Sequence, residues 1–538
     1  MYIIIYDFGT SSVKTCLFDI DSEVRLVASS TAGYGLYISD DGGAEQDTEE
    51  WWAALCSTTR ALFQKTDVKP EEIEGMAFCS QMQGTVLVDA NGNALRRPMN
   101  YLDQKGVKEY RECMGRGLVK VSGCSLYKLV RNLLVNYAGS TSAKDPVWKY
   151  KWVENNEPDV FRKIYKWLDI GDYLTSRCTG RIVRTADSAF ATFLYDTRKG
   201  KEGWNKGLLK MYKVDPDHMP EIIDCTDLVG GLTEKAAAEL GLVKGIPVFG
   251  GGDTTFVNIG AGCTRPGDTH IYVGTSGWVS TYLNYQTVDI NAMITGVLSA
   301  KHGYFNYYAE LETAGKCFEW AMDHLALDEV GVYLEHTKVT DIESKYTSLY
   351  DYLSEEVRKV PPGANGVIFT PWLHGNRCPF EDSKAGGMFF NIRIENGKRD
   401  MIRAILEGIC YHLRWLLECE TKKVKTSDTI RFVGGGALSP LTCQMLADIT
   451  GRTIETVHNT QEVGAIGTAL VVAAGIKGTD VLELARQLVK VAQTYVPDPS
   501  NKAVYERNYQ VFKRLYSCNA ENFKALNHNS KGIIKAFR

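Results

Sequence analysis

The side chains in this sequence that could do chemistry are carboxylates set in glycine-rich turns. Asp253 follows three glycines in residues 250–262, GGGDTTFVNIGAG, and Asp7 opens the turn Asp-Phe-Gly-Thr-Ser. A carboxylate within hydrogen-bond reach of a hydroxyl group can take its proton as a general base. A carboxylate can also hold Mg²⁺ through water, and Lys14, just after the first turn, could reach a terminal phosphate.

Two further turns have the same character. Gly-Thr-Ser recurs at residues 274–276, and Gly-Gly-Gly-Ala occurs at 434–437. Consecutive backbone N–H groups and hydroxyls in such turns form concave sites for anions. Together with the first turn they could bind one nucleotide, although the chain has neither a P-loop nor a Gly-x-Gly-x-x-Gly motif. Taken singly, each turn is better explained as the end of a strand in an α/β protein.

The predicted elements place these turns between strands. Near the N-terminus, β-rich segments at residues 2–6, 13–18 and 24–28 predict an antiparallel meander around the first turn. Residues 269–273 and 278–283 flank the second Gly-Thr-Ser turn in the same way. Because the pattern occurs once near the start of each half, it is a weak sign of an internal repeat.

The third turn lies between a strand and a helix. A strand at residues 429–432 leads into it, and the helix that follows is capped by Ser439, begins with Pro440 and ends at Gly451. Such a mixture of strands, glycine turns and helices predicts the α/β class.

A second helix follows soon after. A strand at 453–457 and a capping box at 459–462 precede residues 463–474, whose Gly and Ala content predicts a closely packed internal helix. Helical periodicity also covers residues 407–420 and 503–517.

The predicted domain boundary lies at residues 245–252, where a proline and four glycines follow a helix-like stretch ending at Leu242. It divides the chain into a domain at 1–249, a second at 250–480 and a helical extension at 481–538 that packs on the second domain.

Composition excludes several classes of partner. The 61 basic and 65 acidic residues give a net charge of -4, which provides no basic surface for nucleic acid or anionic lipid. No apolar run approaches the ~20 residues of a membrane helix, so a cytoplasmic protein is expected. The 14 cysteines include no Cys-x-x-Cys pair, and the 9 histidines lack metal-binding spacing, which favours free thiols and no zinc site. A small-molecule partner is therefore predicted.

The order of these motifs resembles that of the FGGY family of carbohydrate kinases. The similarity covers nearly the whole chain and is greatest to the members that act on D-xylulose. Further matching segments are Glu45-Gln46-Asp47, Trp51-Trp52, Ser80-Gln81-Met82-Gln83-Gly84, Lys149 to Asn156, Asp172-Tyr173-Leu174, Gly245-Ile246-Pro247-Val248 and Pro371-Trp372-Leu373. Such an ordered set is highly specific.

The resemblance implies two ribonuclease H-like domains of the actin, sugar kinase and heat-shock ATPase superfamily. Residues 1–249 would form the sugar-binding domain and 250–480 the nucleotide-binding domain, with the active site in the cleft between them. The implied reaction transfers the γ-phosphoryl group of ATP, with Mg²⁺, to a ketopentose hydroxyl, giving xylulose 5-phosphate if the sugar is D-xylulose.

The resemblance also assigns roles to residues. Asp253 matches the catalytic base, and the metal-associated carboxylates are Asp7 and Asp253. The ATP-binding matches are Thr10, Ser11, Lys14, Thr275, Ser276, Gly315, Gly435, Gly436 and Ala437. The sugar-binding matches are Met82, Gln83, Asp103, Asp253 and Thr254.

Some positions depart from the family pattern. Gln83 and Thr254 stand where the members acting on D-xylulose usually carry His and Asn, and glutamine cannot become cationic as histidine can. Tyr and Lys flank Asp103 in place of Trp and Arg, and a surface turn is the alternative explanation for that aspartate. Pro440 replaces the Asn found near adenine in glycerol kinases, so the adenine must be recognised differently.

These departures leave alternatives open. A kinase of the same family could act on ribulose, gluconate, erythritol or glycerol. A sugar- and ATP-binding regulator that no longer transfers phosphate would be a different class, although the presence of Asp7, Lys14 and Asp253 argues against it. A chaperone-like or filament-forming ATPase is a third possibility, and a homodimer is open.

Overall fold

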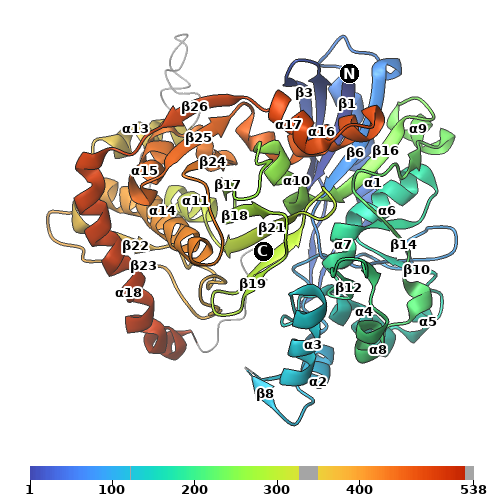
Figure 1. Cartoon of the computed structure of the whole chain (residues 1–538), viewed down its shortest axis with the longest axis horizontal. Coiled ribbons are helices and arrows are strands. Elements are labelled where there is room, and N and C mark those ends of the chain that lie inside the picture. The colour runs from blue at the N-terminus through green and yellow to red at the C-terminus, as the bar shows by residue number, and fades with distance from the viewer. Residues whose placement is uncertain (122, 326–348, 528–538) are drawn as a thin grey trace.

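The computed structural model describes residues 1–121, 123–325 and 349–527. The chain forms two lobes, each built around a large β-sheet (Figure 1). Strands of the first sheet come from residues 2–252, and strands of the second from 269–495. Among the described residues, no helix is long and apolar enough to cross a membrane. The predicted α/β class is confirmed.

The first sheet has the strand order β15-β16-β6-β1-β2-β3. Its strands are β1 (Tyr2–Phe8), β2 (Ser12–Ile20), β3 (Val24–Gly33), β6 (Ile73–Ser80), β15 (Gly230–Gly231) and β16 (Pro247–Gly252). β1 pairs antiparallel with β2 and parallel with β6, and β6 pairs parallel with β16. Side chains alternate across β1, so that Ile3 and Ile5 lie in one apolar cluster and Ile4 and Tyr6 in another.

The second sheet repeats this arrangement. Its order is β19-β20-β21-β18-β17-β24-β25-β26, and β17 pairs antiparallel with β18 and parallel with β24, as β1 does with β2 and β6. The strands are β17 (Thr269–Val273), β18 (Gly277–Leu283), β19 (Val288–Asp289), β20 (Ile294–Leu298), β21 (Phe305–Leu311), β24 (Thr429–Val433), β25 (Thr453–Val457) and β26 (Val491–Tyr495). The internal repeat suggested by two Gly-Thr-Ser turns is thus a repeat of topology.

Helices cover both faces of the first sheet. α1 (Thr48–Phe63) packs on β2 and β3, and α6 (Ile170–Thr179) packs on β6 and β16. α16 (Val463–Lys477) comes from the second half of the sequence but packs on β1, β6 and β16 (Figure 1). Residues 465–474 of α16 are all buried, which confirms the predicted internal helix.

α16 also crosses α10 (Asp253–Gly260), and glycines permit the contact. A Cβ atom at Gly260 would lie 1.8 Å from the carbonyl oxygen of Val463, and one at Gly467 would lie 2.1 Å from that of Phe256. Both distances are far below van der Waals contact, so only glycine allows the two backbones to approach this closely.

Helices of the second lobe pack on its sheet and on one another. They are α11 (Gly315–His324), α13 (Leu349–Arg358), α14 (Lys398–Lys423), α15 (Pro440–Thr450) and α18 (Lys502–Leu526), beside the hairpin of β22 (Ile368–Thr370) and β23 (Met388–Phe390). α17 (Val481–Leu488) packs instead on α16 and α10. α18 contacts α14 and α15, as expected for an extension packed on this lobe. The extension is not wholly helical, however, because β26 adds a strand to the sheet through β25.

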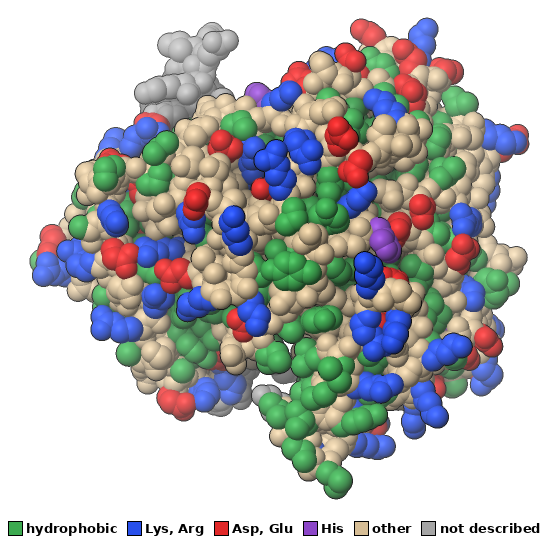
Figure 2. Space-filling model, viewed as in Figure 1, with side chains coloured by type: hydrophobic (Ala, Val, Ile, Leu, Met, Phe, Trp, Pro, Cys, Tyr) green, Lys and Arg blue, Asp and Glu red, His purple; other side chains and the backbone are tan. Residues whose placement is uncertain are grey.

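The remaining elements extend the first lobe. They are β4 (Tyr37–Ile38), β5 (Ala44–Glu45), β7 (Val86–Val88), α2 (Val107–Met114), β8 (Lys120–Val121), β9 (Cys124–Ser125), α3 (Leu126–Asn136), α4 (Pro146–Asn156), α5 (Pro158–Phe161), β10 (Lys166–Leu168), β11 (Val183–Thr185), α7 (Ala186–Phe190), β12 (Tyr195–Asp196), β13 (Gly203–Trp204), α8 (Lys206–Tyr212), β14 (Glu221–Ile223) and α9 (Glu234–Leu240). α2, β8 and α3 project from the lobe, and apolar side chains gather on this projection (Figure 2).

Two local predictions need correction. The boundary predicted between residues 249 and 250 falls inside β16, which pairs with β6 as far as Gly252. The capping box predicted at 459–462 is wrong, because residues 460–462 form a 3₁₀ turn and the side chain of Glu462 forms an ion pair with Lys14 instead.

Candidate active site

The candidate catalytic carboxylates lie at one edge of the first sheet. In the pairing of β1, β6 and β16, Phe8, Ser80 and Gly252 are neighbours at the carboxyl ends of the three parallel strands. Asp7 therefore lies within β1 at this edge, and Asp253 directly follows β16. Ligands of open α/β sheets bind at this kind of edge.

Asp253 is the first residue of α10 and is half-buried. One of its carboxylate oxygens accepts a hydrogen bond of 2.7 Å from the backbone N–H of Thr254. Burial raises the pKa of Asp253 to about 7, and the negative charges of Asp7, Asp169 and Asp187 add to the increase. A carboxylate whose pKa lies near neutral pH can accept a proton more effectively than an ordinary one.

The glycines before Asp253 form a buried strand. A Cβ atom at Gly250 would lie 2.8 Å from the side chain of Thr175, and one at Gly252 would lie 2.1 Å from the sulfur of Met82. Side chains therefore pack directly on this strand, and glycine leaves the space that they occupy.

Asp187, in α7, holds the junction between β16 and α10. Its carboxylate accepts hydrogen bonds of 2.7 Å from the backbone N–H of Gly252 and from the hydroxyl of Thr255, and one of 3.2 Å from the thiol of Cys225. Sequence reasoning missed this residue because no motif surrounds it. The three donors come from segments more than 35 residues away.

The first and second turns, which both carry Gly-Thr-Ser, present unpaired backbone donors. Within the described chain, no hydrogen bond engages the backbone N–H groups of Thr10, Ser11, Thr275 or Ser276. The Thr10 hydroxyl lies 3.1 Å from that of Tyr101, and the Thr10 carbonyl accepts a bond of 2.7 Å from Gln46. These turns are therefore anchored through other atoms while their N–H groups remain available to an anion.

The second turn packs on the start of α11. The backbone N–H of Gly315 donates to the carbonyl of Gly274 at 2.9 Å, and those of Ala314 and Lys316 donate to the carbonyl of Thr275 at 3.1 Å. A Cβ atom at Gly315 would lie 2.4 Å from the Gly274 oxygen, so glycine is required there.

The third turn lies beside the second at the edge of the second sheet. Gly434 has φ 87°, and a Cβ atom there would lie 2.5 Å from the carbonyl oxygen of Val273. Gly435, Gly436 and Ala437 then form a 3₁₀ turn before Ser439, whose side chain caps α15 by accepting from Thr442 N–H, as predicted.

Lys14 and Glu462 join the two lobes at this edge. The Lys14 ammonium forms an ion pair with the Glu462 carboxylate, and Lys14 lies opposite Asp7 in the pairing of β1 with β2. Burial raises the pKa of Asp7 to about 6, with Lys14 lowering it and Glu462 raising it.

Asp7 and Asp253 are a donor set of two carboxylates. Among the described residues there is no cluster of three or more His, Cys, Asp or Glu suited to a metal. Mg²⁺ in kinase sites is held by one or two carboxylates together with substrate phosphates and water. The pair therefore fits a magnesium ion that arrives with a nucleotide.

Three of the predicted sugar contacts, Met82, Gln83 and Thr254, come together next to Asp253. The Thr254 hydroxyl lies 3.2 Å from the sulfur of Met82, and Gln83 follows in a left-handed conformation with φ 63°. Asp169 fixes this turn by accepting the backbone N–H groups of Gln83 and Gly84 at 3.0 and 2.8 Å.

Lys149 supports the same turn, and Asp103 holds a neighbouring segment. The buried Lys149 ammonium donates to the carbonyl oxygens of Gln83 and Asn100 at 2.8 and 2.6 Å, and burial lowers its pKa to about 8. Asp103 is 0% exposed, and its oxygens accept the backbone N–H groups of Ala44 and Lys105. Asp103 is therefore not part of a surface turn, and its contact with a sugar stays a prediction.

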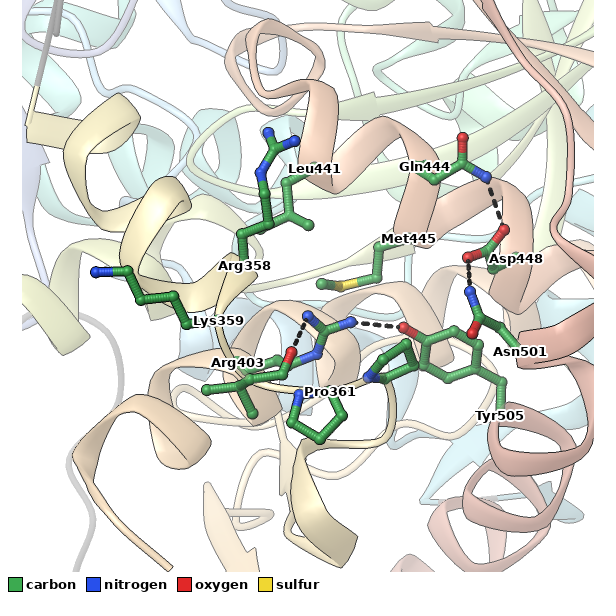
Figure 3. Close-up of a pocket in the computed structure, with 12 residues that line it drawn as sticks. Arg358, Lys359, Pro361, Arg403, Leu441, Gln444, Met445, Asp448, Asn501 and Tyr505 are labelled. Atoms are coloured by element: carbon green, nitrogen blue, oxygen red, sulfur yellow. Dashed lines mark hydrogen bonds between the residues drawn. The ribbon is translucent and has the colours of Figure 1, made fainter. Parts of the chain in front are cut away.

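A cavity of ≈ 330 Å³ lies elsewhere, between α13, α15 and the start of α18 (Figure 3). It contains none of the predicted site residues. Arg403 in its wall donates to Glu407, Val360 and Tyr505, and Asp448 accepts from Gln444 and Asn501. These charged groups are satisfied within the protein.

Comparison with known proteins connects this geometry to a family. The model of the N-terminal domain of the FGGY family of carbohydrate kinases matches residues 2–260, and that of the C-terminal domain matches 270–476. The chain is 30% identical over 526 residues to the xylulose kinase of Lactococcus lactis subsp. lactis (strain IL1403), covering 97% of each chain.

Solved structures share the fold. The ligand-bound xylulose kinase from Lactobacillus acidophilus has a TM-score of 0.83 at 23% identity, covering 98% of this chain and 99% of the other. The gluconate kinase from the same organism has a TM-score of 0.82, also at 23% identity and with the same coverage. The similarity of fold therefore does not distinguish a xylulose kinase from a gluconate kinase. The two family models, however, together span most of the sequence. This chain belongs to the FGGY family of carbohydrate kinases.

Proposed function

We propose that this sugar kinase transfers the γ-phosphoryl group of ATP to a hydroxyl of a ketopentose, with D-xylulose as its preferred substrate and Asp253 as the general base. The observation that carries the proposal is the half-buried Asp253, with a pKa of about 7, at the sheet edge where the Thr10 and Ser11 turn presents free N–H groups. The choice of D-xylulose rests on the similarity to the Lactococcus lactis xylulose kinase.

In this proposal Asp253 takes the proton of the attacking hydroxyl. A general base in position contributes typically ~10² to 10⁴ in rate. The remaining acceleration comes from alignment of the hydroxyl with the γ-phosphorus and from stabilisation of charge on the phosphoryl oxygens. Thr10, Ser11, Thr275 and Ser276 supply the N–H groups for that purpose.

The nucleotide would lie between the two lobes. Lys14 binds a terminal phosphate, Gly315 lies beside the second phosphate turn, and Gly435, Gly436 and Ala437 border the adenosine. Mg²⁺, held by Asp7 and Asp253 with water and phosphate oxygens, would neutralise charge on the phosphates.

The sugar would lie against Met82, Gln83 and Thr254. Gln83 offers an amide and Thr254 a hydroxyl, so both can donate to or accept from sugar oxygens. Lys149 acts one layer further out by donating to the carbonyl oxygen of Gln83, and Asp103 would accept a sugar hydroxyl.

A substrate panel tests the choice of sugar. ATP and Mg²⁺ are supplied with D-xylulose, D-ribulose, gluconate, erythritol or glycerol, and ADP release is followed by a coupled assay. The highest kcat/KM is expected with D-xylulose. A higher kcat/KM with any other compound on the panel contradicts this substrate, while leaving the phosphoryl transfer itself intact.

A paired variant probes the same pocket. Gln83→His with Thr254→Asn restores the side chains usual in D-xylulose kinases, and should raise the kcat/KM ratio of D-xylulose over gluconate. The matched control is Gln444→His, because Gln444 lines the separate cavity between α13 and α15. If the kcat/KM ratio changes equally in the double variant and in the control, Gln83 and Thr254 do not take part in substrate recognition.

The projection of the first lobe is the proposed site of a homodimer. Seven large apolar side chains are exposed there: Leu118, Val119, Val121, Leu126, Tyr127, Val130 and Leu134. Their exposed fractions run from 38% at Leu126 to 107% at Leu118, so the projection presents a group of apolar side chains to solvent. Monomers rarely expose apolar patches this large.

Sedimentation velocity tests the dimer. The wild type should sediment as a dimer at micromolar concentration, and Leu118→Ser with Leu134→Ser as a monomer. Leu228→Ser, at a residue 50% exposed elsewhere, is the matched control and should stay dimeric. A monomeric wild type contradicts the proposal, as does a dimer that persists in the double variant.

A further inference from the structure

A chain of buried polar side chains connects the helix of the proposed base to the hairpin of the second phosphate turn. Asn258 lies in α10, five residues after Asp253. His270 lies in β17, and Trp278 lies in β18, on the other side of the turn that carries Thr275 and Ser276.

The hydrogen bonds of this chain have a defined direction. The indole N–H of Trp278 can only donate, and it lies 2.9 Å from Nε2 of His270. Nε2 is therefore the acceptor, so the proton of the neutral ring is on Nδ1, which donates to the amide oxygen of Asn258. Burial lowers the pKa of His270 to about 3, which keeps the ring neutral.

The chain continues to the backbone beside Asp253. The amide nitrogen of Asn258 donates to the amide oxygen of Asn306, in β21. The amide nitrogen of Asn306 in turn donates to the carbonyl oxygen of Thr254 at 3.1 Å. Asn258, His270 and Asn306 are 0%, 2% and 1% exposed. The side chains of His270 in β17 and Asn306 in β21 thus hold α10 at both its first turn and its middle.

The interface between α10 and α16 is apolar. Phe256, Val257 and Ile259 of α10 lie in the same buried cluster as Val463 and Ile466 of α16. Apolar contacts are non-directional, whereas a satisfied buried hydrogen-bond network specifies one arrangement of the elements that it joins. The hydrogen-bond network can therefore fix the position of α10, which the apolar contacts alone would allow to shift.

We propose that Asn258 and His270 are positioning residues that lock the helix carrying Asp253 to the hairpin carrying Thr275 and Ser276. Neither side chain touches the substrate. The pair keeps the base and the phosphate-binding turn at the separation that phosphoryl transfer requires, and this inference rests on the proposed role of Asp253.

The test uses His270→Phe, which removes both hydrogen bonds of the ring and keeps a flat side chain. A misplacement of about 1 Å can cost ~10²-fold in rate, so kcat should fall by roughly 10². The KM values for ATP and for the sugar should stay within about threefold, because each substrate still meets an intact half of the site. The assay uses whichever sugar gives the highest turnover.

A conservative variant and a control separate positioning from stability. His270→Gln can still accept from Trp278 and donate to Asn258, so it should restore most of kcat. Thr281→Val is the matched control: Thr281 lies on the same hairpin and joins the buried hydrogen bonds between Thr269 and Glu420. None of the hydrogen bonds of Thr281 reaches α10. Loss of the Thr281 hydroxyl should therefore lower the melting temperature but leave kcat unchanged.

If His270→Phe fails to fold, Asn306→Thr serves instead, because a β-branched residue suits a strand and the substitution removes the amide that accepts from Asn258 and donates to Thr254. The inference is overturned if kcat of the folded variant matches that of Thr281→Val, or if His270→Gln is as slow as His270→Phe. If the base assignment itself is wrong, Asp253→Ala keeps its turnover. A slow Asp253→Ala with a fast His270→Phe refutes only the positioning network.

Discussion

The Lys14 ammonium in the first lobe forms an ion pair with the Glu462 carboxylate, 448 residues further along the chain. Lys14 lies on β2, and Glu462 directly precedes α16, the helix that packs on the first sheet. The pair brings the lysine that we propose to bind phosphate to a carboxylate beside the third turn, since the carbonyl oxygen of Thr460 accepts the N–H of Gly434 at 2.8 Å.

The first prediction is that the stability lost on breaking the ion pair of Lys14 and Glu462 can be recovered without recovering turnover. Lys14→Met leaves the Glu462 side chain, only 10% exposed, without its partner, which should lower the free energy of unfolding by about 2 kcal/mol. Adding Glu462→Gln removes the unpaired charge and should recover most of that loss. Turnover should stay low in both variants, because the phosphate contact is missing. Urea unfolding and ADP release measure the two effects, and a double variant no more stable than Lys14→Met contradicts this account.

The second prediction is a pH-dependent stability difference. The pKa of Asp253 is about 7 in the folded protein against an ordinary value of 3.8. Between these values the folded state binds more protons than the unfolded state, so the wild type loses stability as the pH rises. Asp253→Asn carries no such charge and should be more stable at about pH 8 by on the order of 1 to 3 kcal/mol.

The difference between Asp253→Asn and the wild type should shrink as the pH falls and vanish near pH 4, where the carboxyl group is protonated in the folded and about half protonated in the unfolded state. Urea unfolding at several pH values measures it. A difference that stays constant with pH would mean that Asp253 does not have a raised pKa.

The third prediction concerns Asp187. Asp187→Ala leaves the N–H of Gly252 and the hydroxyl of Thr255 without an acceptor, which should cost about 2 to 4 kcal/mol of stability. Because Gly252 precedes the base, kcat should also fall, by roughly 10-fold or more. Cys225→Ser is the control, since it keeps a donor to Asp187. Equal kcat values in the two variants would assign Asp187 a purely structural role.

Much of the fold was predictable because it depends on local interactions. The strands at residues 269–273 and 453–457 follow the predicted bounds, and Ser439 and Gly451 cap α15 as expected. β26 was missed because its five residues are mostly exposed and lack a clear alternating pattern. Such a strand is defined by its pairing with β25 rather than by its own sequence.

The site was predictable only in part. Gly-Thr-Ser turns and an aspartate after glycines are local signals, so Asp7, Thr10 and Asp253 could be found. Glu462 was misread, because the spacing Asn-x-x-Glu fits a capping box and carries no trace of a partner 448 residues away. The partners of Asp187 and His270 likewise come from distant segments, and a single sequence does not show such pairs.

The fourth prediction concerns the crossing of α10 and α16. Gly467→Ala would put a Cβ atom 2.1 Å from the carbonyl oxygen of Phe256, so the helices would have to separate. A loss of more than about 2 kcal/mol is expected. Gly397→Ala is the control, because no atom lies within 4 Å of its Cβ position. Thermal unfolding compares the two, and similar melting temperatures would contradict the close crossing.

The central claim is that Asp253 is the general base, and turnover of Asp253→Ala tests it most directly. With ATP, Mg²⁺ and the preferred sugar, we expect kcat to fall by ~10² to 10⁴, while titration calorimetry still detects ATP binding. Those two results together would distinguish the enzyme from a non-catalytic regulator. Turnover equal to that of the wild type would contradict the assignment.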